Sequence, residues 1–141
     1  MNYFLDTSAL FKLFVHEDLS EYYLSVLQDD PSICVSSLSW VEFHSALRRR
    51  AHSKGLSKGQ RDGILERFKK DWNAYVKVRV SDAVLESAAR LVEIHSLKTL
   101  DSIQLACALD MAAGFQEPLA FLTADHALQT AARAEKLQTQ I

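Results

Sequence analysis

Four acidic residues that lie far apart in the sequence have the right type for metal chemistry: Asp6, Glu42, Asp101 and Asp125. Asp6 and Asp125 follow short apolar runs, whereas Glu42 and Asp101 lie in the first turns of expected helices. If these side chains converge, each like-charged pair at ~4 Å costs about 4 kcal/mol at an effective dielectric of about 20, so the site needs protons or a cation. An all-oxygen ligand set selects a hard ion, Mg²⁺ or Mn²⁺.

Each acid also has a purely structural interpretation. Asp6 could do no more than favour a helix N-terminus electrostatically. Residues 39–42 match a capping box, in which a serine caps the helix and a glutamate bonds back to the backbone. Thr99 and Thr123 could be helix caps in the same way, each with an acid two residues later. The sequence leaves both interpretations open for each acid taken singly.

The elements that must position these acids are short strands alternating with helices. A buried strand ends at Asp6, and Ser8 begins a helix that continues to Phe14, with the serine hydroxyl as its cap. Strands are also expected over residues 33–35, 76–80 and 119–122, with an edge strand over 137–141. Helices are expected over residues 19–27, 37–54, 57–75, from 81 onward, and over 100–113 and 125–136. This alternation predicts an α/β fold: a three-layer α/β/α sandwich with a short, mostly parallel central sheet.

The composition is that of one folded domain. A chain of 141 residues, 48% of them hydrophobic, fits a single globular domain over residues 1–141. Cys34 and Cys107 lie in apolar runs with neither disulfide nor metal-ligand spacing, so we interpret them as core residues in a reducing compartment. The sequence shows neither a signal segment nor an apolar run of membrane-spanning length, which favours a cytoplasmic protein with no membrane partner.

The net charge of −2 conceals a strong asymmetry. Residues 48–70 contain nine lysines or arginines against two acids, a balance of +7, whereas the rest of the chain carries −9. Such a basic segment is typical of a polyanion-binding surface, although an exposed helical hairpin solvated by cations gives the same count. The residues that we single out as candidate RNA contacts are Arg48, Arg49, Arg50 and Lys54.

Four segments in order carry a resemblance to a known family. They are residues 3–10 (YFLDTSAL), the helix that contains Glu42, residues 98–106 (KTLDSIQLA) and residues 121–125 (FLTAD). Together they resemble the PIN domain and, more narrowly, the VapC-type ribonuclease toxins of prokaryotic type II toxin–antitoxin pairs. The family's acidic quartet matches Asp6, Glu42, Asp101 and Asp125, of which Asp6 and Asp101 would bind metal most directly. The hydroxyl positions that support this quartet match Thr7, Ser8 and Thr123.

The resemblance implies a Mg²⁺-dependent endoribonuclease, with Mn²⁺ as the alternative ion, that cleaves RNA phosphodiester bonds. It also implies an antitoxin partner whose C-terminal tail lies in a groove beside the active site. Candidates for that groove are Phe11, Phe14, Tyr22 and Tyr23, although all four could equally be ordinary core aromatics. A homodimer or a toxin–antitoxin hetero-oligomer is a further expectation from the family.

Two other functions fit parts of the same pattern. One is a catalytically silent RNA-binding protein of the same fold, although such a protein has no electrostatic reason to retain four mutually repelling acids. The other is an acidic-pocket signalling module that binds Mg²⁺ and accepts a phosphoryl group on an acid. In such a module the acceptor should end a central strand, whereas Asp101 begins an apolar helix.

Overall fold

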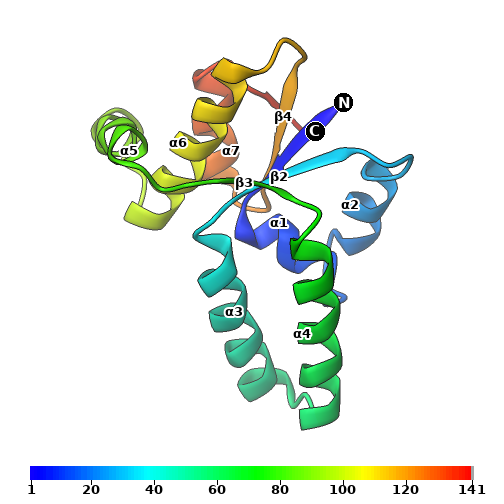
Figure 1. Cartoon of the computed structure of the whole chain (residues 1–141). Coiled ribbons are helices and arrows are strands. Elements are labelled where there is room, and N and C mark those ends of the chain that lie inside the picture. The colour runs from blue at the N-terminus through cyan, green and yellow to red at the C-terminus, as the bar shows by residue number, and fades with distance from the viewer. Residues whose placement is uncertain (141) are drawn as a thin grey trace.

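The structure, a computed structural model, describes residues 1–140. Five parallel strands form one sheet with helices on both faces (Figure 1). In chain order the elements are β1 (Asn2–Leu5), α1 (Thr7–Phe11), α2 (Ser20–Val26), β2 (Ser32–Ser36), α3 (Ser39–Lys54), α4 (Lys58–Trp72), β3 (Val76–Val78), α5 (Asp82–His95), α6 (Thr99–Gly114), β4 (Leu119–Leu122), α7 (His126–Ala134) and β5 (Gln138–Thr139).

β1 is the central strand of this sheet. The strand order is β3-β2-β1-β4-β5, and each neighbouring pair is parallel. Phe4 in β1 is the register partner of both Cys34 in β2 and Phe121 in β4. The chain builds outward from β1 to β3 and then returns to place β4 on the other side of β1. The topology therefore switches direction between β1 and β4, where the crevice beyond the strand ends is the usual ligand site of open α/β sheets.

Alternation of side chains along the strands divides the core into two parts. The part that packs against α5, α6 and α7 includes Phe4, Cys34 and Phe121. The part that packs against α1 to α4 includes Leu5, Val35 and Leu122. The three layers predicted from the sequence are thus confirmed, and the sheet is entirely parallel.

α6 is the buried helix that its apolar sequence predicts. Leu105, Ala106, Cys107 and Ala108 are all buried, and the helix packs between the sheet and α5. Because α6 has little exposed surface along its middle, its position relative to the strands is fixed by packing. The polar residues of its first two turns are thereby held at a defined place beside the sheet.

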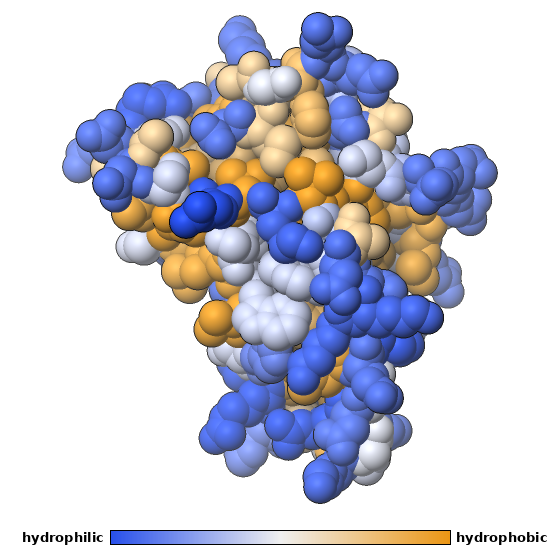
Figure 2. Space-filling model, in the orientation of Figure 1, coloured by the Kyte–Doolittle hydropathy of each residue, from blue (hydrophilic) through white to orange (hydrophobic). Residues whose placement is uncertain are grey.

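α3 and α4 form a hairpin that projects away from the sheet (Figure 1). The rings of Phe43 and Phe68 stack with their centroids 3.7 Å apart at the base of this hairpin. Gly55 ends α3 in the left-handed conformation, and Ser57 caps α4 in a capping box with Gln60. Figure 2 shows that hydrophilic residues cover most of the outer end of the hairpin, at the bottom of the view.

The first helix differs from the expected one at both ends. α1 ends at Phe11 instead of Phe14, and its cap is Asp6 instead of Ser8. The reason is that the Asp6 carboxylate accepts a hydrogen bond from the backbone N–H of Ala9, three residues later. A carboxylate one residue beyond the strand end therefore takes the capping position that the sequence suggested for the serine.

The remaining elements follow the predicted order with small shifts at their ends. The strand expected over residues 76–80 ends at Val78, and the expected edge strand is present as Gln138–Thr139, parallel to β4. Ile141, the last residue of the expected edge strand, lies outside the described residues. Cys34 and Cys107 are buried and unbridged. Among residues 1–140, the helices lack the combination of length and apolar character that crossing a membrane requires.

Candidate active site

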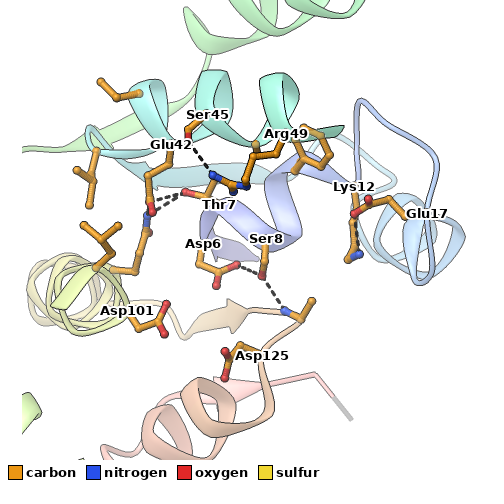
Figure 3. A pocket seen from close by; sticks show the side chains of 17 residues that line it. Asp6, Thr7, Ser8, Lys12, Glu17, Glu42, Ser45, Arg49, Asp101 and Asp125 are labelled. Atoms are coloured by element: carbon orange, nitrogen blue, oxygen red, sulfur yellow. Dashed lines mark hydrogen bonds and ion pairs between the residues drawn. The ribbon is translucent and has the colours of Figure 1, made fainter. Parts of the chain in front are cut away.

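All four acids line a single pocket of about 540 Å³ at the carboxyl ends of the strands. Asp6 lies between β1 and α1, Glu42 in the first turn of α3, Asp101 in the first turn of α6, and Asp125 at the start of α7. Figure 3 shows Asp6, Asp101 and Asp125 around one space, with Glu42 on its α3 side. The fold therefore brings together side chains that are separated by up to 119 positions in the sequence.

Asp6 is the buried acid of the pocket, with only 4% of its surface exposed. One carboxylate oxygen accepts hydrogen bonds from the Ala9 N–H (3.0 Å) and the Ser8 hydroxyl (2.7 Å), and the other accepts from the Thr123 hydroxyl (2.6 Å). The Asp6 pKa is raised from 3.8 to about 6, chiefly because the carboxyl is buried; the hydrogen bonds oppose this rise, and the negative charge of Asp101 adds to it. The carboxylate is thus fixed in orientation and poorly solvated.

Glu42 is held by a second set of hydrogen bonds that does not include Asp6. Its Oε1 atom accepts from the Thr7 hydroxyl and from the Gln104 amide, each at 2.7 Å. The Ser39 hydroxyl lies 2.9 Å from that of Thr7 and 3.0 Å from the Gln104 amide nitrogen. The Gln104 amide can donate its two protons to Glu42 and Ser39, while the Ser39 hydroxyl donates to Thr7 and the Thr7 hydroxyl donates to Glu42. Each donor then has a partner, and the hydrogen bonds end at the Glu42 carboxylate, which can only accept.

Asp101 and Asp125 are less constrained than the other two acids. No hydrogen bond reaches the Asp101 carboxylate from any of residues 1–140, and Asp125 is exposed. Partial burial raises the Asp101 pKa, as do the charges of Asp125 and Glu42, whereas Lys98 lowers it. The Asp101 carboxylate is thus unbonded within residues 1–140, whereas Asp125 is exposed but accepts one backbone hydrogen bond.

The helix-cap interpretation holds for two acids and fails for the other two. Asp6 caps α1, and Asp125 caps α7 by accepting from the Leu128 N–H at 2.9 Å. By contrast, no side chain caps α3 or α6, so the capping box at residues 39–42 and the Thr99 cap do not form. An ionised carboxylate has about four lone-pair sites, so one capping bond leaves capacity for a ligand.

The supporting residues divide differently from what sequence reasoning suggested. Ser8 and Thr123 bond Asp6, as expected of residues behind a metal ligand, while Thr7 bonds Glu42. Gln104 was not among the sequence candidates, although it is 2% exposed and bonds Glu42. The available signal was its position three residues after Asp101, which places both on one side of α6.

The donor chemistry of the pocket fits a hard divalent cation, since its four candidate ligands are all carboxylates. In the conformation described, no three His, Cys, Asp or Glu side chains of residues 1–140 lie close enough together to hold one ion. The pocket therefore supplies the donor type for a hard divalent cation but not, in this conformation, a ready-made group of ligands.

The sequence of residues 3–134 matches the PIN domain family. This chain belongs to the PIN domain family. The resemblance inferred from the four segments is therefore confirmed at the level of the family, whose members are generally nucleases that typically use divalent metals. No curated protein sequence matches the chain significantly.

Solved structures show the same PIN fold at low sequence identity. PAE2754 from Pyrobaculum aerophilum is 17% identical, with a TM-score of 0.69 over 99% of this chain and 89% of its own. VapBC2 from Rickettsia felis, bound to a DNA fragment from its promoter, is 18% identical, with a TM-score of 0.65 over 99% of this chain and 98% of its own. A chain of a toxin–antitoxin complex from Klebsiella pneumoniae is 20% identical, with a TM-score of 0.63 over 87% of this chain and 86% of its own. At such identities the likeness concerns the fold.

The basic candidates of this PIN domain occupy different environments. Arg49 lines the acidic pocket, where its guanidinium donates to the Ser45 hydroxyl at 2.7 Å. Arg50 instead pairs with Glu17 at 2.6 Å, and Glu17 also pairs with Lys12 at 2.9 Å. The two remaining candidates, Arg48 and Lys54, are exposed. Arg49 thus forms no ion pair within residues 1–140, whereas Arg50 belongs to an ion-pair network whose other members, Glu17 and Lys12, also line the pocket.

The aromatic candidates are not brought together in one groove of the PIN domain. Phe11, Phe14 and Tyr23 are buried in the core on the α1-to-α4 side of the sheet, with at most 7% of each exposed. Of the four, only Phe11 lines the acidic pocket, and Tyr22 lines separate hollows near α2. The alternative interpretation, that these are core aromatics, describes the three buried residues.

Proposed function

We propose that this PIN domain is a metal-dependent endoribonuclease that uses Mg²⁺, with Mn²⁺ as a substitute, to cleave RNA phosphodiester bonds. The observation that carries the proposal is the convergence of Asp6, Glu42, Asp101 and Asp125 from four separate elements on one pocket. Three of the four accept hydrogen bonds from buried or half-buried residues, which is how proteins orient metal ligands and the groups around them.

The four acids would play different parts in metal binding, because their carboxylates are held to different degrees. Asp6 would hold the ion in a fixed position, Asp101 would turn toward it, and Asp125 and Glu42 would complete the set. When bound, the ion supplies a water of lowered pKa and neutralises charge on the phosphodiester. Ser8 and Thr123 keep Asp6 oriented, and Arg49 offers the substrate phosphate a charged donor at the edge of the pocket.

We further propose that the chain is the toxin of a type II toxin–antitoxin pair. Supporting this are the resemblance to VapC-type toxins and the fold likeness to proteins described as VapBC2, a toxin–antitoxin complex and FitAcB from Neisseria gonorrhoeae. Its partner would be an antitoxin, in a toxin–antitoxin hetero-oligomer or beside a toxin homodimer. Its RNA substrates would lie in the cytoplasm.

Cleavage of labelled single-stranded RNA by the purified protein tests the nuclease proposal. We expect products with Mg²⁺, none with excess EDTA, and none from Asp101→Asn with Mg²⁺. Asp110→Asn is the matched control, because Asp110 is an exposed acid on the same helix and does not line the pocket. Cleavage that persists in EDTA, or that both variants lose equally, would refute the assignment.

The same preparation separates the two alternatives. A silent RNA-binding protein would retain RNA without cutting it at any Mg²⁺ concentration. A signalling module would take up phosphate from acetyl phosphate onto an acid. Asp6, which follows the central strand, is the acid best placed for such acceptance, yet it is buried and both of its oxygens accept hydrogen bonds.

Expression in cells tests the toxin proposal separately from the chemistry. We expect the wild-type protein to arrest growth and Asp101→Asn to be harmless. Co-expression with the product of a small adjacent reading frame should restore growth and give a complex that copurifies. If the protein cleaves RNA in vitro but does not impair growth, the nuclease proposal stands and the toxin proposal is refuted.

A further inference from the structure

A second hollow opens between α3 and α4, next to the acidic pocket. Its volume is about 450 Å³, and it is lined by Arg48, Arg49, Ala51, His52, Leu56 and Arg61. Three of these side chains are cationic, and the lining includes no acid and no aromatic ring other than the histidine. We call this hollow the basic cleft. Its charge is opposite to that of the pocket beside it.

Arg49 connects the two, since it lines both the acidic pocket and the basic cleft. Glu42, Ser45, Arg49 and His52 follow one another at intervals of three, four and three residues, so they share one face of α3. Figure 3 shows Arg49 extending along α3 beside Ser45, on the side of the acids. A continuous polar stripe therefore leads from the acids into the cleft.

We propose that the basic cleft binds a backbone phosphate of the same RNA strand whose scissile phosphate lies in the acidic pocket. This inference rests on the proposed ribonuclease function. Arginine guanidinium groups match phosphate oxygens in geometry and can donate to two of them at once. Guanidinium groups that bond phosphate oxygens contact the backbone and not the base edges, so this contact carries no base preference.

The spacing along α3 sets the length of RNA that reaches both sites. With a rise of ~1.5 Å per residue, Arg49 lies about 10 Å and His52 about 15 Å beyond Glu42 along the helix axis. A stacked strand advances ~3.4 Å per nucleotide, so this interval corresponds to about three or four nucleotides. A dinucleotide therefore occupies the acidic pocket alone, whereas a strand of about 12 nucleotides spans both.

The cations of the basic cleft are available for such a contact. Arg48 and Arg61 are exposed, and no ion pair involves either of them among residues 1–140. Arg50, two residues after Arg48, is paired instead with Glu17 and lines a different hollow. The sequence run of three arginines is thus divided into two that face the cleft and one that stabilises the fold.

Binding of labelled RNA of about 12 nucleotides in EDTA, followed by fluorescence anisotropy between about 50 and 200 mM salt, tests the proposal without any cleavage. We expect Arg61→Gln to weaken binding and to reduce the slope of log K against log salt by about 0.7, the value for one phosphate contact on a single strand. Lys70→Gln is the matched control, since Lys70 is an exposed cation on α4 that does not line the cleft. It should leave the slope unchanged.

An unchanged slope in Arg61→Gln, or an equal reduction in Lys70→Gln, would overturn the basic cleft as a specific phosphate site. A second measurement compares kcat/KM for the strand of about 12 nucleotides with that for a dinucleotide. We expect the advantage of the long strand to shrink in Arg61→Gln and to persist in Lys70→Gln; an undiminished advantage in Arg61→Gln would overturn the proposal. If the wild-type protein cleaves neither RNA, the nuclease assignment fails while the salt slopes still decide the cleft.

Discussion

The acidic pocket and the basic cleft share Arg49, yet their charges are held in different ways. In the pocket, Asp6 and Glu42 accept short hydrogen bonds from residues fixed by the sheet and by α6. In the cleft, Arg48 and Arg61 are exposed on a projecting helical hairpin and form no ion pair within residues 1–140. Metal chemistry requires side chains placed to within a fraction of an ångström, whereas attraction of a polyanion requires only charge density.

This difference predicts that equal changes of charge have unequal consequences. Asp6→Asn should lower the rate of RNA cleavage with saturating Mg²⁺ by on the order of 100-fold or more, because it removes a fixed ligand. Arg48→Gln should change that rate only a few-fold, with its effect in KM. Steady-state kinetics of both variants checks the contrast. Comparable losses in kcat would show that the two regions do not differ in the way proposed.

The buried acid should also make metal-free stability depend on pH. The Asp6 pKa is raised from 3.8 to about 6, so the folded state binds this proton more tightly than the unfolded chain does. The proton therefore stabilises the fold fully below about pH 4, and that stabilisation of about 3 kcal/mol is lost as the pH rises through 6. The basic cleft has no buried acid of this kind among its lining residues.

Urea unfolding in EDTA at about pH 4 and pH 7 measures this effect against Asp6→Asn, which cannot titrate at this position. We expect the variant to gain up to about 3 kcal/mol relative to the wild type on going from the lower to the higher pH. Asparagine offers one acceptor oxygen where the carboxylate offers two, so the variant loses at least one hydrogen bond; that loss is the same at both pH values and does not enter the gain. A stability difference that is the same at both pH values would contradict the burial argument.

Gln104 provides an intermediate case, because it holds an acid without being one. Gln104→Met removes both amide donors from Glu42 and Ser39 with little change in volume. Loss of a residue behind a metal ligand typically costs about 10-fold to 100-fold in metal affinity or activity. Mn²⁺ binding followed by electron paramagnetic resonance provides a readout besides cleavage. Gln129→Met is the matched control, a buried glutamine on α7 outside the acidic pocket.

We expect metal affinity to fall in Gln104→Met and to stay at the wild-type level in Gln129→Met. Each variant is compared at a temperature below its own unfolding transition. Equal Mn²⁺ affinity in the two variants would show that Gln104 contributes only to packing. Loss of Mn²⁺ affinity in Gln104→Met alone would establish that the orientation of Glu42 depends on α6.

The smallest effects should come from the arginine run, where two neighbours are expected to behave differently. Arg50→Gln breaks the half-buried pair with Glu17 and should cost about 1 kcal/mol of folding stability without changing the salt dependence of RNA binding. Arg49→Gln should leave stability nearly unchanged and weaken RNA binding a few-fold. Thermal unfolding and anisotropy on the same samples check both; a reversal of the two phenotypes would contradict the division of the run.

Much of the fold was predictable from local pattern. Short apolar runs gave the strands, helical spacing gave α3 to α7 within a few residues, and the absence of long polar connections indicated one alternating α/β unit. The first helix was misjudged because sequence could not tell which of Asp6 and Ser8 caps it; the Asp6 carboxylate accepts from the Ala9 N–H, while the Ser8 hydroxyl donates to that carboxylate and caps nothing. Likewise, Ser39 resembled a cap but bonds Thr7 across the sheet edge.

The identities of the four acids were fixed by the sequence itself, because a carboxylate just after a strand or in a first helical turn is a local signal. Tertiary structure alone decided their assembly into one pocket and the hydrogen bonds from Thr7 and Gln104 to Glu42. Each of these joins elements that are distant in the chain. The same holds for Arg48, Arg49 and Arg50, whose identical side chains acquire different environments from the direction in which α3 presents each one. Periodicity specifies which residues share a helix face, whereas packing of the helix against the sheet specifies what that face meets.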